Sequence, residues 1–228
     1  MSQTVLKINE IFRSIQGESS RAGLPCTFVR LRGCPLRCHY CDTSYAFREG
    51  ESHTLEEVLE QVGSFGISLV QITGGEPLAQ TPVFQLIEML CDQNYTVLIE
   101  TSGVCDISAC DPRAIKIVDI KTPSSGAENS FLETNYASLT KQDEIKFVIT
   151  NREDFEWACG LSIERNLLEI VSVVHFSPVT PQEGNEEIQG HEGLDPETLS
   201  GWLLDEAPWA RLNLQLHKFI WPASMRGV

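Results

Sequence analysis

The sequence predicts an α/β fold: an incomplete, TIM-like barrel of about six parallel strands with a reduced set of helices. Segments rich in β-branched residues alternate with helical segments, which is typical of parallel βα units. Several of the strands end in glycines or polar residues, and parallel barrels collect their active sites at those strand ends. The strands are too few for a closed barrel of eight, and 228 residues suit a single domain spanning 1–228.

In the first half of the chain, two helices are predicted between strands. Thr54 and Glu57 have the spacing of a capping box, so we expect a helix that begins there and continues to Phe65. A second helix is predicted over Pro82–Asp92, with Thr81 as its N-cap. The predicted strands of this half, the first of them short and running into a turn, are Leu6–Glu18, Thr27–Arg32, Ile67–Thr73, Tyr95–Glu100 and Ile115–Ile120.

In the second half, strands and helices continue to alternate up to an apolar tail. His175 lies within a predicted strand and is interpreted as a structural histidine. Asp195 is the predicted N-cap of the last helix, and Phe219 and Trp221 are expected to dock back onto the protein. The predicted elements are a short helix over Phe131–Leu139, a strand over Glu144–Thr150, a helix over Arg152–Asn166, a strand over Val171–Ser177, an exposed loop over Pro178–Glu192, a helix over Pro196–Leu204 and a terminal strand over Arg211–Leu216.

Three cysteines lie close together in the loop 33–43, at a C-x3-C-x2-C spacing: Cys34, Cys38 and Cys41. No fourth cysteine or histidine completes a closed zinc site at this spacing, whereas three ligands and one vacancy suit an iron–sulfur cluster with an open iron. The alternatives are half of a zinc ribbon in a non-catalytic metal-binding module, or simply buried thiols. The remaining cysteines form no second close pair and are interpreted as structural: Cys26, Cys91, Cys105, Cys110 and Cys159.

Composition limits the kinds of partner that the protein is expected to bind and the compartment in which it is expected. The net charge of −15 argues against nucleic acid as a direct partner, because phosphate binding needs a basic face. No apolar run approaches the ~20 residues that span a bilayer, and the first residues form no apolar signal core. We therefore expect no membrane association and a cytoplasmic location, where a reducing environment suits thiolate ligands.

A second motif strengthens the interpretation of the cysteines. Gly74-Gly75-Glu76-Pro77 follows a predicted strand downstream of the cysteine loop. Together, the loop and this motif resemble the radical S-adenosylmethionine enzymes. The resemblance implies a [4Fe–4S] cluster in the loop 33–43 that binds S-adenosylmethionine, and a reductant such as flavodoxin or ferredoxin. An electron from the cluster then cleaves the sulfonium and releases a 5′-deoxyadenosyl radical.

Longer stretches resemble one family within that class, the 7-carboxy-7-deazaguanine synthases. These stretches are FRSIQGES at 12–19, FVRLRGCPLRCHYCDT at 28–43, ITGGEP at 72–77 and LQLHKFIWPASMRGV at 214–228. The resemblance implies conversion of 6-carboxy-5,6,7,8-tetrahydropterin to 7-carboxy-7-deazaguanine and ammonia, by hydrogen abstraction and ring contraction, in queuosine and deazapurine biosynthesis. It also implies reuse of S-adenosylmethionine, assistance by Mg²⁺ and a homodimer. The nearest alternative is an activase that installs a glycyl radical on another protein.

The same resemblance implies roles for individual residues. Thr43 would place its hydroxyl on Mg²⁺, although a hydroxyl at that position could also cap the turn. Arg30 would pair with the substrate carboxylate, with a surface salt bridge as the alternative. The cluster ligands would be Cys34, Cys38 and Cys41; the S-adenosylmethionine contacts Tyr40, Cys41, Asp42, Gly75, Ser102, Asp119 and Lys121; and the other substrate contacts Ile15, Gln16, Gly17, Glu18, Thr73 and Pro222.

Overall fold

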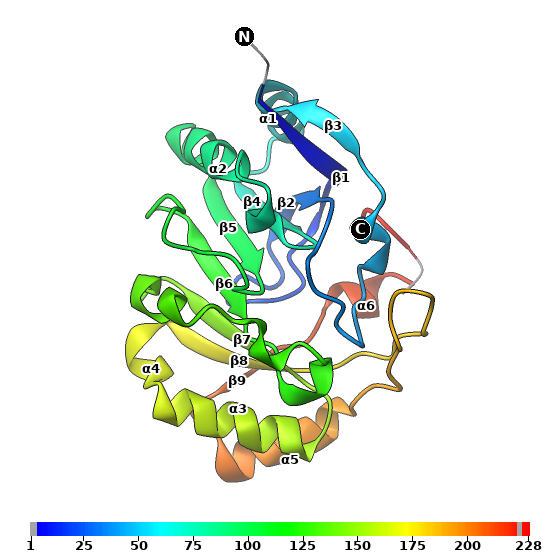
Figure 1. The fold of residues 1–228 in the computed structure, drawn as a ribbon, viewed down its shortest axis with the longest axis vertical. Coiled ribbons are helices and arrows are strands. Elements are labelled where there is room, and N and C mark those ends of the chain that lie inside the picture. Colours follow the sequence, from blue (N-terminus) through cyan, green and yellow to red (C-terminus); the bar gives the residue numbers. More distant parts are fainter. Residues whose placement is uncertain (1–3, 223–224) are drawn as a thin grey trace.

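A computed structural model describes residues 4–222 and 225–228. Its centre is one open sheet of nine strands in the order β3-β1-β2-β4-β5-β6-β7-β8-β9 (Figure 1). From β2 to β9 every neighbouring pair is parallel, whereas β1 pairs antiparallel with both β2 and β3. The predicted partial barrel is confirmed: six parallel strands carry it, and the two-residue β9 extends it.

The strands and helices lie close to their predicted positions. The strands are β1 Val5–Ile15, β2 Pro25–Leu31, β3 Glu51–Thr54, β4 Leu69–Gly74, β5 Thr96–Thr101, β6 Ile115–Asp119, β7 Glu144–Ile149, β8 Val173–Pro178 and β9 Arg211–Leu212. The α-helices are α1 Leu55–Ser64, α2 Val83–Asp92, α3 Arg152–Glu164, α4 Leu167–Ile170, α5 Pro196–Glu206 and α6 His217–Ile220. Helices α1 and α2 cover the outer face of the first part of the sheet, and α3 and α5 cover its second part (Figure 1).

The predicted helix caps are confirmed in two of three cases. Thr54 Oγ1 accepts a hydrogen bond from the Glu57 backbone N–H, and the Glu57 carboxylate accepts one from Thr54, so the capping box is complete. Asp195 accepts from the backbone N–H of Glu197 at the start of α5. The Thr81 cap is wrong: Pro82 itself occupies the N-cap of α2 in a helical conformation, which leaves the Thr81 side chain too far out to cap.

One strand was not predicted, and two predictions needed correction. The strand β3 has a polar sequence, and it forms because β2 occupies only one edge of β1 and leaves the opposite edge free to pair. Residues Glu133–Ser138 form a 3₁₀ helix in place of the predicted helix over 131–139. β9 ends at Leu212, four residues earlier than predicted, because the chain then leaves the sheet edge and turns toward the strand ends.

The tail docks differently from the prediction. Phe219 is 70% exposed, which contradicts its expected burial, whereas Trp221 is half-buried. The reason is the short helix α6, whose His217 and Lys218 contact the body of the protein, so that Phe219 points away from it. Residues 223 and 224 of the predicted closing tail lie outside the described residues.

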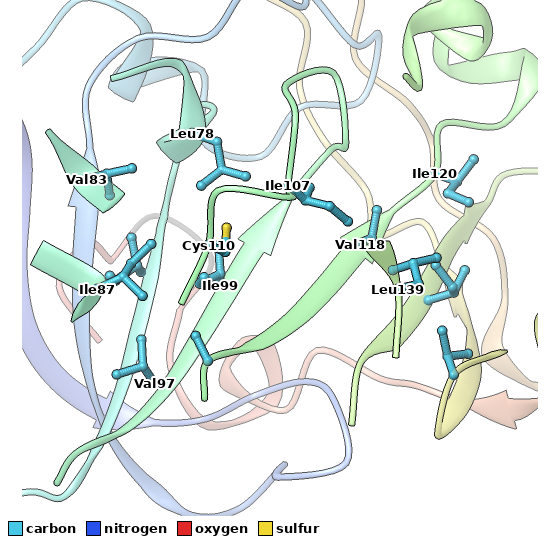
Figure 2. Close-up of a cluster of buried hydrophobic side chains, with 14 of the residues drawn as sticks. Leu78, Val83, Ile87, Val97, Ile99, Ile107, Cys110, Val118, Ile120 and Leu139 are labelled. Carbon is cyan, nitrogen blue, oxygen red and sulfur yellow. The ribbon is translucent and has the colours of Figure 1, made fainter. Parts of the chain in front are cut away.

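The alternation of side chains along the strands produces two different faces. Val70 and Ile72 of β4 belong to the large apolar core between the sheet and the outer helices, part of which Figure 2 shows around α2, β5 and β6. Gln71 and Thr73, the alternate residues of the same strand, point to the inner face. None of the described helices has the length and apolarity needed to cross a bilayer.

Candidate active site

A cavity of about 220 Å³ lies on the inner face of the sheet, at the carboxyl ends of the parallel strands. The loop 33–43 forms one wall. It follows β2 without helix or strand structure and is held in place by backbone hydrogen bonds from Gly33 to Ala46 and from His39 to Ser125. All three cysteines of the loop line the cavity. Strand topology thus brings the loop next to strand ends far away in the sequence.

All of the predicted site residues except one line the cavity. Pro222 does not line it, because the backbone is extended after α6 and leaves Pro222 exposed to solvent; His217 and Val228 reach the cavity from the same tail. The predicted residues that do line it are Ile15, Gln16, Gly17, Glu18, Arg30, Cys34, Cys38, Tyr40, Cys41, Asp42, Thr43, Thr73, Gly75, Ser102, Asp119 and Lys121.

The motif Gly74–Pro77 has a structural role as well as a place at the cavity. A Cβ on Gly75 would collide with the backbone oxygen of Gly33, so only glycine lets β4 pack against the start of the cysteine loop. Glu76 is fully buried, and its carboxylate accepts hydrogen bonds from the Thr101 hydroxyl (2.7 Å) and from the Ser102 backbone N–H (2.8 Å) and hydroxyl (2.6 Å). The motif therefore fixes the loop and the end of β5 relative to each other.

The cavity floor is a network of polar side chains, of which the sequence predicted Gln16 and Glu18 but not Gln71, Glu100 or Lys146. Lys146 Nζ of β7 lies 2.9 Å from Glu18 Oε2 and also contacts Glu100 Oε1. Glu100, the residue before the end of β5, accepts a further hydrogen bond from Gln71 Nε2 at 2.8 Å. For Gln71, Glu100 and Lys146 a signal was present in the sequence: each is a polar side chain inside a largely apolar strand, at a position whose neighbours face the core.

Charge pairs within the cavity shift the pKa values of their members. Burial raises the pKa of Glu18, but Lys146 and the hydrogen bond from Gln215 outweigh it and lower the pKa to about 2. Burial lowers the pKa of Lys146, but Glu100 and Glu18 outweigh it and hold the pKa well above its usual range. Both groups are therefore charged across the physiological range.

The loop 33–43 and the end of β6 differ from the floor in having unpartnered polar atoms. The hydroxyl of Tyr40 and Oδ1 of Asp119 are both buried and make no hydrogen bond. Thr43 occupies the N-cap position of the 3₁₀ helix Ser44–Phe47 but makes no capping hydrogen bond; its hydroxyl lies 3.8 Å from Cys41 Sγ. Buried polar groups without partners are rare in native proteins, so these atoms mark places for a ligand.

Two predicted contacts are already engaged within the protein. Arg30 Nε lies 2.8 Å from Glu10 Oε1, so the alternative of a salt bridge is realised, but at a partly buried position on the cavity wall. Asp42 Oδ2 lies 2.9 Å from Lys218 Nζ of α6. Among residues 4–222 and 225–228, no three His, Cys, Asp or Glu side chains converge closely enough to hold a single metal ion.

Comparisons with known proteins agree with this site. The model of the radical SAM superfamily matches residues 28–119, which contain the cysteine loop and the Gly74–Pro77 motif. A 7-carboxy-7-deazaguanine synthase from Koribacter versatilis is 42% identical over 98% of this chain and all of its own length. Another from Chlorobaculum tepidum is 40% identical over 100% of this chain and 99% of its own. The crystal structure of QueE from Escherichia coli has the same fold, with a TM-score of 0.71 and 23% identity over 93% of this chain and 95% of that one.

The fold and the cysteine loop define a radical S-adenosylmethionine enzyme, a class whose members use a [4Fe–4S] cluster and S-adenosylmethionine and need a reductant. Within this class the chain belongs to the 7-carboxy-7-deazaguanine synthase family. Family membership sets aside both alternatives raised by the sequence, the glycyl-radical activase and the non-catalytic metal-binding module.

Proposed function

We propose that this chain converts 6-carboxy-5,6,7,8-tetrahydropterin to 7-carboxy-7-deazaguanine and ammonia, by hydrogen abstraction and ring contraction. Family membership supports this activity, and the observation that carries it is the cavity itself. One cavity is lined by the three cysteines of the loop 33–43, the polar segment Gln16–Glu18 and the strand ends. The deazapurine pathway that includes queuosine would use the product. One domain spanning 1–228 would perform the reaction, since a single sheet takes strands from Val5 to Leu212.

Cys34, Cys38 and Cys41 would hold the [4Fe–4S] cluster, because three thiols on one wall leave a coordination position open toward the cavity. With S-adenosylmethionine bound, the reduced cluster would supply the one-electron chemistry that begins the reaction. The protein's own task is to bind, orient and keep water away. Partly buried thiols in a lined cavity meet that requirement.

The S-adenosylmethionine contacts would come from the loop and from three strand ends. Tyr40 and Asp119 support this assignment because each has a buried oxygen without a partner. Lys121 Nζ lies 2.9 Å from Asp119 Oδ2 and would add a cation to the same corner. The carboxylate of Asp42 is engaged with Lys218, and the hydroxyl of Ser102 with Glu76. We therefore assign the S-adenosylmethionine contacts of Asp42 and Ser102 to their backbone atoms. We assign those of Cys41 and Gly75 to backbone atoms as well.

Thr43 would coordinate Mg²⁺ through its hydroxyl, since that hydroxyl faces the cavity and caps no turn. Mg²⁺ suits the position because it takes few protein oxygens and completes its shell with water and ligand oxygens. Thr43→Ala removes this oxygen without disturbing a cap.

The substrate would lie between the loop after β1 and the strand ends. Arg30 would pair with the substrate carboxylate through its guanidinium, which Glu10 fixes in place. Gln16 and Glu18 would meet the donors and acceptors on the pyrimidine edge of the pterin, and Ile15, Gly17 and Thr73 would complete the wall. All of these groups surround the same space, so one bound molecule can reach them together.

We also propose a homodimer, a flavodoxin or ferredoxin as electron donor, and a cytoplasmic location. Exposed apolar side chains on α6 and just after it, Phe219, Ile220 and Met225, support an interface there. Light scattering on the purified protein tests the dimer. A reducing compartment would keep the cluster ligands as thiols before the cluster is loaded.

The decisive experiment is an anaerobic turnover assay with cluster-loaded protein, reductant, S-adenosylmethionine, Mg²⁺ and 6-carboxytetrahydropterin, analysed by mass spectrometry. We expect 7-carboxy-7-deazaguanine in excess over any 5′-deoxyadenosine released, because the cofactor is reused. If 5′-deoxyadenosine accumulates without that product, the substrate assignment is wrong while the radical chemistry stands.

A further inference from the structure

One lysine contacts two of the acidic side chains of the cavity and lies close to a third. The side chain of Lys146 is 6% exposed on the inner face of β7. Its Nζ lies 2.9 Å from Glu18 Oε2, contacts Glu100 Oε1, and lies 3.6 Å from Asp119 Oδ2. Lys146 pairs in register with Asp119 on the neighbouring strand β6, so it reaches past β6 to the end of β5 and up to the loop after β1.

The two carboxylates held by Lys146 come from segments far apart in the sequence, which a hydrogen bond from Gln16 to Gln71 also links. Glu18 lies after β1 and accepts a second hydrogen bond from Gln215 Nε2 at 2.9 Å. Glu100 lies near the end of β5 and accepts from Gln71 Nε2 and from the Thr73 hydroxyl. Every one of these bonds requires a carboxylate oxygen that accepts, so the network is complete when both acids are ionised.

We propose that Lys146 is a positioning residue for the reaction: it holds Glu18 and Glu100 as a fixed pair of ionised carboxylates that face the substrate. The proposal rests on the function proposed above. Two buried like charges cannot both ionise at close range unless a cation lies between them, since one would take a proton instead. A protonated carboxyl group loses acceptor capacity and could no longer receive the N–H donors of a pterin edge in the same way.

The chain contains a matched control for this lysine. Lys116 is also buried, lies on the adjacent strand β6 and pairs with a carboxylate, with Nζ 3.1 Å from Asp143 Oδ2. Unlike Lys146, it does not line the cavity. Replacing Lys116 by Met therefore measures what the loss of any buried lysine does to the protein, apart from the network.

The charged groups around Lys146 determine the expected pH dependence. Glu18 faces it from the loop after β1, Glu100 from β5, and Asp119 with its partner Lys121 from the end of β6 and just beyond it. On the other side, His175 of β8 pairs in register with Lys146 and lies 2.7 Å from Glu144 Oε2 of β7. Without the ammonium, burial favours a proton on one of the acids that Lys146 holds. Substrate binding by the variants without this charge should then weaken more than that of the wild type as pH falls.

The test compares the cluster-loaded wild type with Lys146→Met, Lys146→Gln, Lys146→Arg and Lys116→Met. The first readout is the Kd of 6-carboxytetrahydropterin between pH 6 and 8, measured by calorimetry with S-adenosylmethionine and without reductant. We expect the ratio of the Kd at pH 6 to the Kd at pH 8 to be at least tenfold larger in Lys146→Met than in the wild type. Lys146→Arg should restore the wild-type pH profile, and Lys116→Met should match the wild type. If Lys146→Met does not fold, Lys146→Gln takes its place, because its side chain keeps hydrogen-bonding capacity without the charge. The same change in the ratio of Kd values is expected.

The second readout needs no substrate: pH-difference infrared spectra of the carboxylic-acid C=O band. A carboxyl group should titrate between pH 5 and 8 in Lys146→Gln but not in the wild type or Lys116→Met. If neither the infrared band nor the ratio of Kd values distinguishes the Lys146 variants from the wild type, the proposal is overturned. Failure of the wild type to bind or convert the pterin would overturn the proposed function instead, and the infrared comparison would still decide the role of Lys146.

Discussion

The two sides of the cavity differ in how completely their polar groups are paired. On the floor, Glu18, Glu100 and Lys146 satisfy one another before any ligand arrives. On the loop side, which includes the adjoining end of β6, the Tyr40 hydroxyl and Asp119 Oδ1 have no partners, although the other Asp119 oxygen lies 3.6 Å from Lys146 Nζ. The floor is therefore preorganised by the protein alone, whereas the loop side is completed by what it binds. Such a division suits an enzyme whose cofactors carry the reactive chemistry and whose protein supplies a fixed frame.

The largest expected effect comes from removing a cluster ligand on the loop side. Cys38→Ala should abolish cluster loading and S-adenosylmethionine cleavage, because two thiolates cannot hold the cluster with an open iron. Iron content and the visible absorption spectrum of the reconstituted protein measure the first, and 5′-deoxyadenosine formation measures the second. Cys26→Ala, a change at a cysteine buried away from the loop, is the control. A full complement of iron in Cys38→Ala would remove this residue from the ligand set.

Next in size is the buried carboxylate that joins the loop side to the end of β5. Glu76→Ala should destabilise the protein by about 3 kcal/mol, because it leaves the Ser102 N–H and the Thr101 and Ser102 hydroxyls buried without their acceptor. Urea unfolding of the cluster-free protein measures the change. Thr54→Ala, which removes an exposed capping box distant from the cavity, should cost about 1 kcal/mol. Equal losses in the two variants would contradict the role given to Glu76.

The ion pairs of the cavity floor should also affect the stability of the protein in acid. The folded-state pKa of Glu18, about 2, lies below its usual value of 4.5, so its ionisation stabilises the fold above pH 4.5, and this contribution is lost as pH falls toward 2. The wild type should therefore lose more stability than Glu18→Gln on acidification from pH 6 to pH 3. Thermal unfolding of both cluster-free proteins at several pH values gives the comparison. Parallel curves would show that Glu18 is not held as an anion by Lys146.

The smallest expected effect concerns only the stimulation of turnover by Mg²⁺. Thr43→Ala should weaken the stimulation of turnover by Mg²⁺ while leaving cluster content and protein stability unchanged, because the hydroxyl caps no helix. Titration of turnover against Mg²⁺ gives the shift in the half-saturating concentration. An identical titration curve in the variant would assign Mg²⁺ to other atoms, and Thr43→Ser should behave as the wild type if the hydroxyl is the ligand.

Much of the fold was predictable because its signals are local. The alternation of strands and helices, the capping box at Thr54 and the cap at Asp195 depend on neighbours within a few residues, and the structure confirms them. The unpredicted parts depend on distant partners. β3 forms because the edge of β1 opposite to β2 is free to pair, and β9 ends early because the chain turns toward Asp42 and Glu18 after leaving the sheet.

The sequence by itself determined the class of this protein and the residues of the loop side, because three cysteines and a glycine-rich motif at fixed spacing are read without knowing the fold. Only the tertiary structure revealed the floor as a network, because the sequence identified Glu18 but neither Glu100 nor Lys146. Lys146 lies 128 residues from Glu18 and 46 residues from Glu100 in the sequence, and no spacing rule joins them. Glu100 and Lys146 meet because parallel strands place alternate side chains on one inner face, and Glu18 reaches them from the loop after β1. A charge buried there must find a partner.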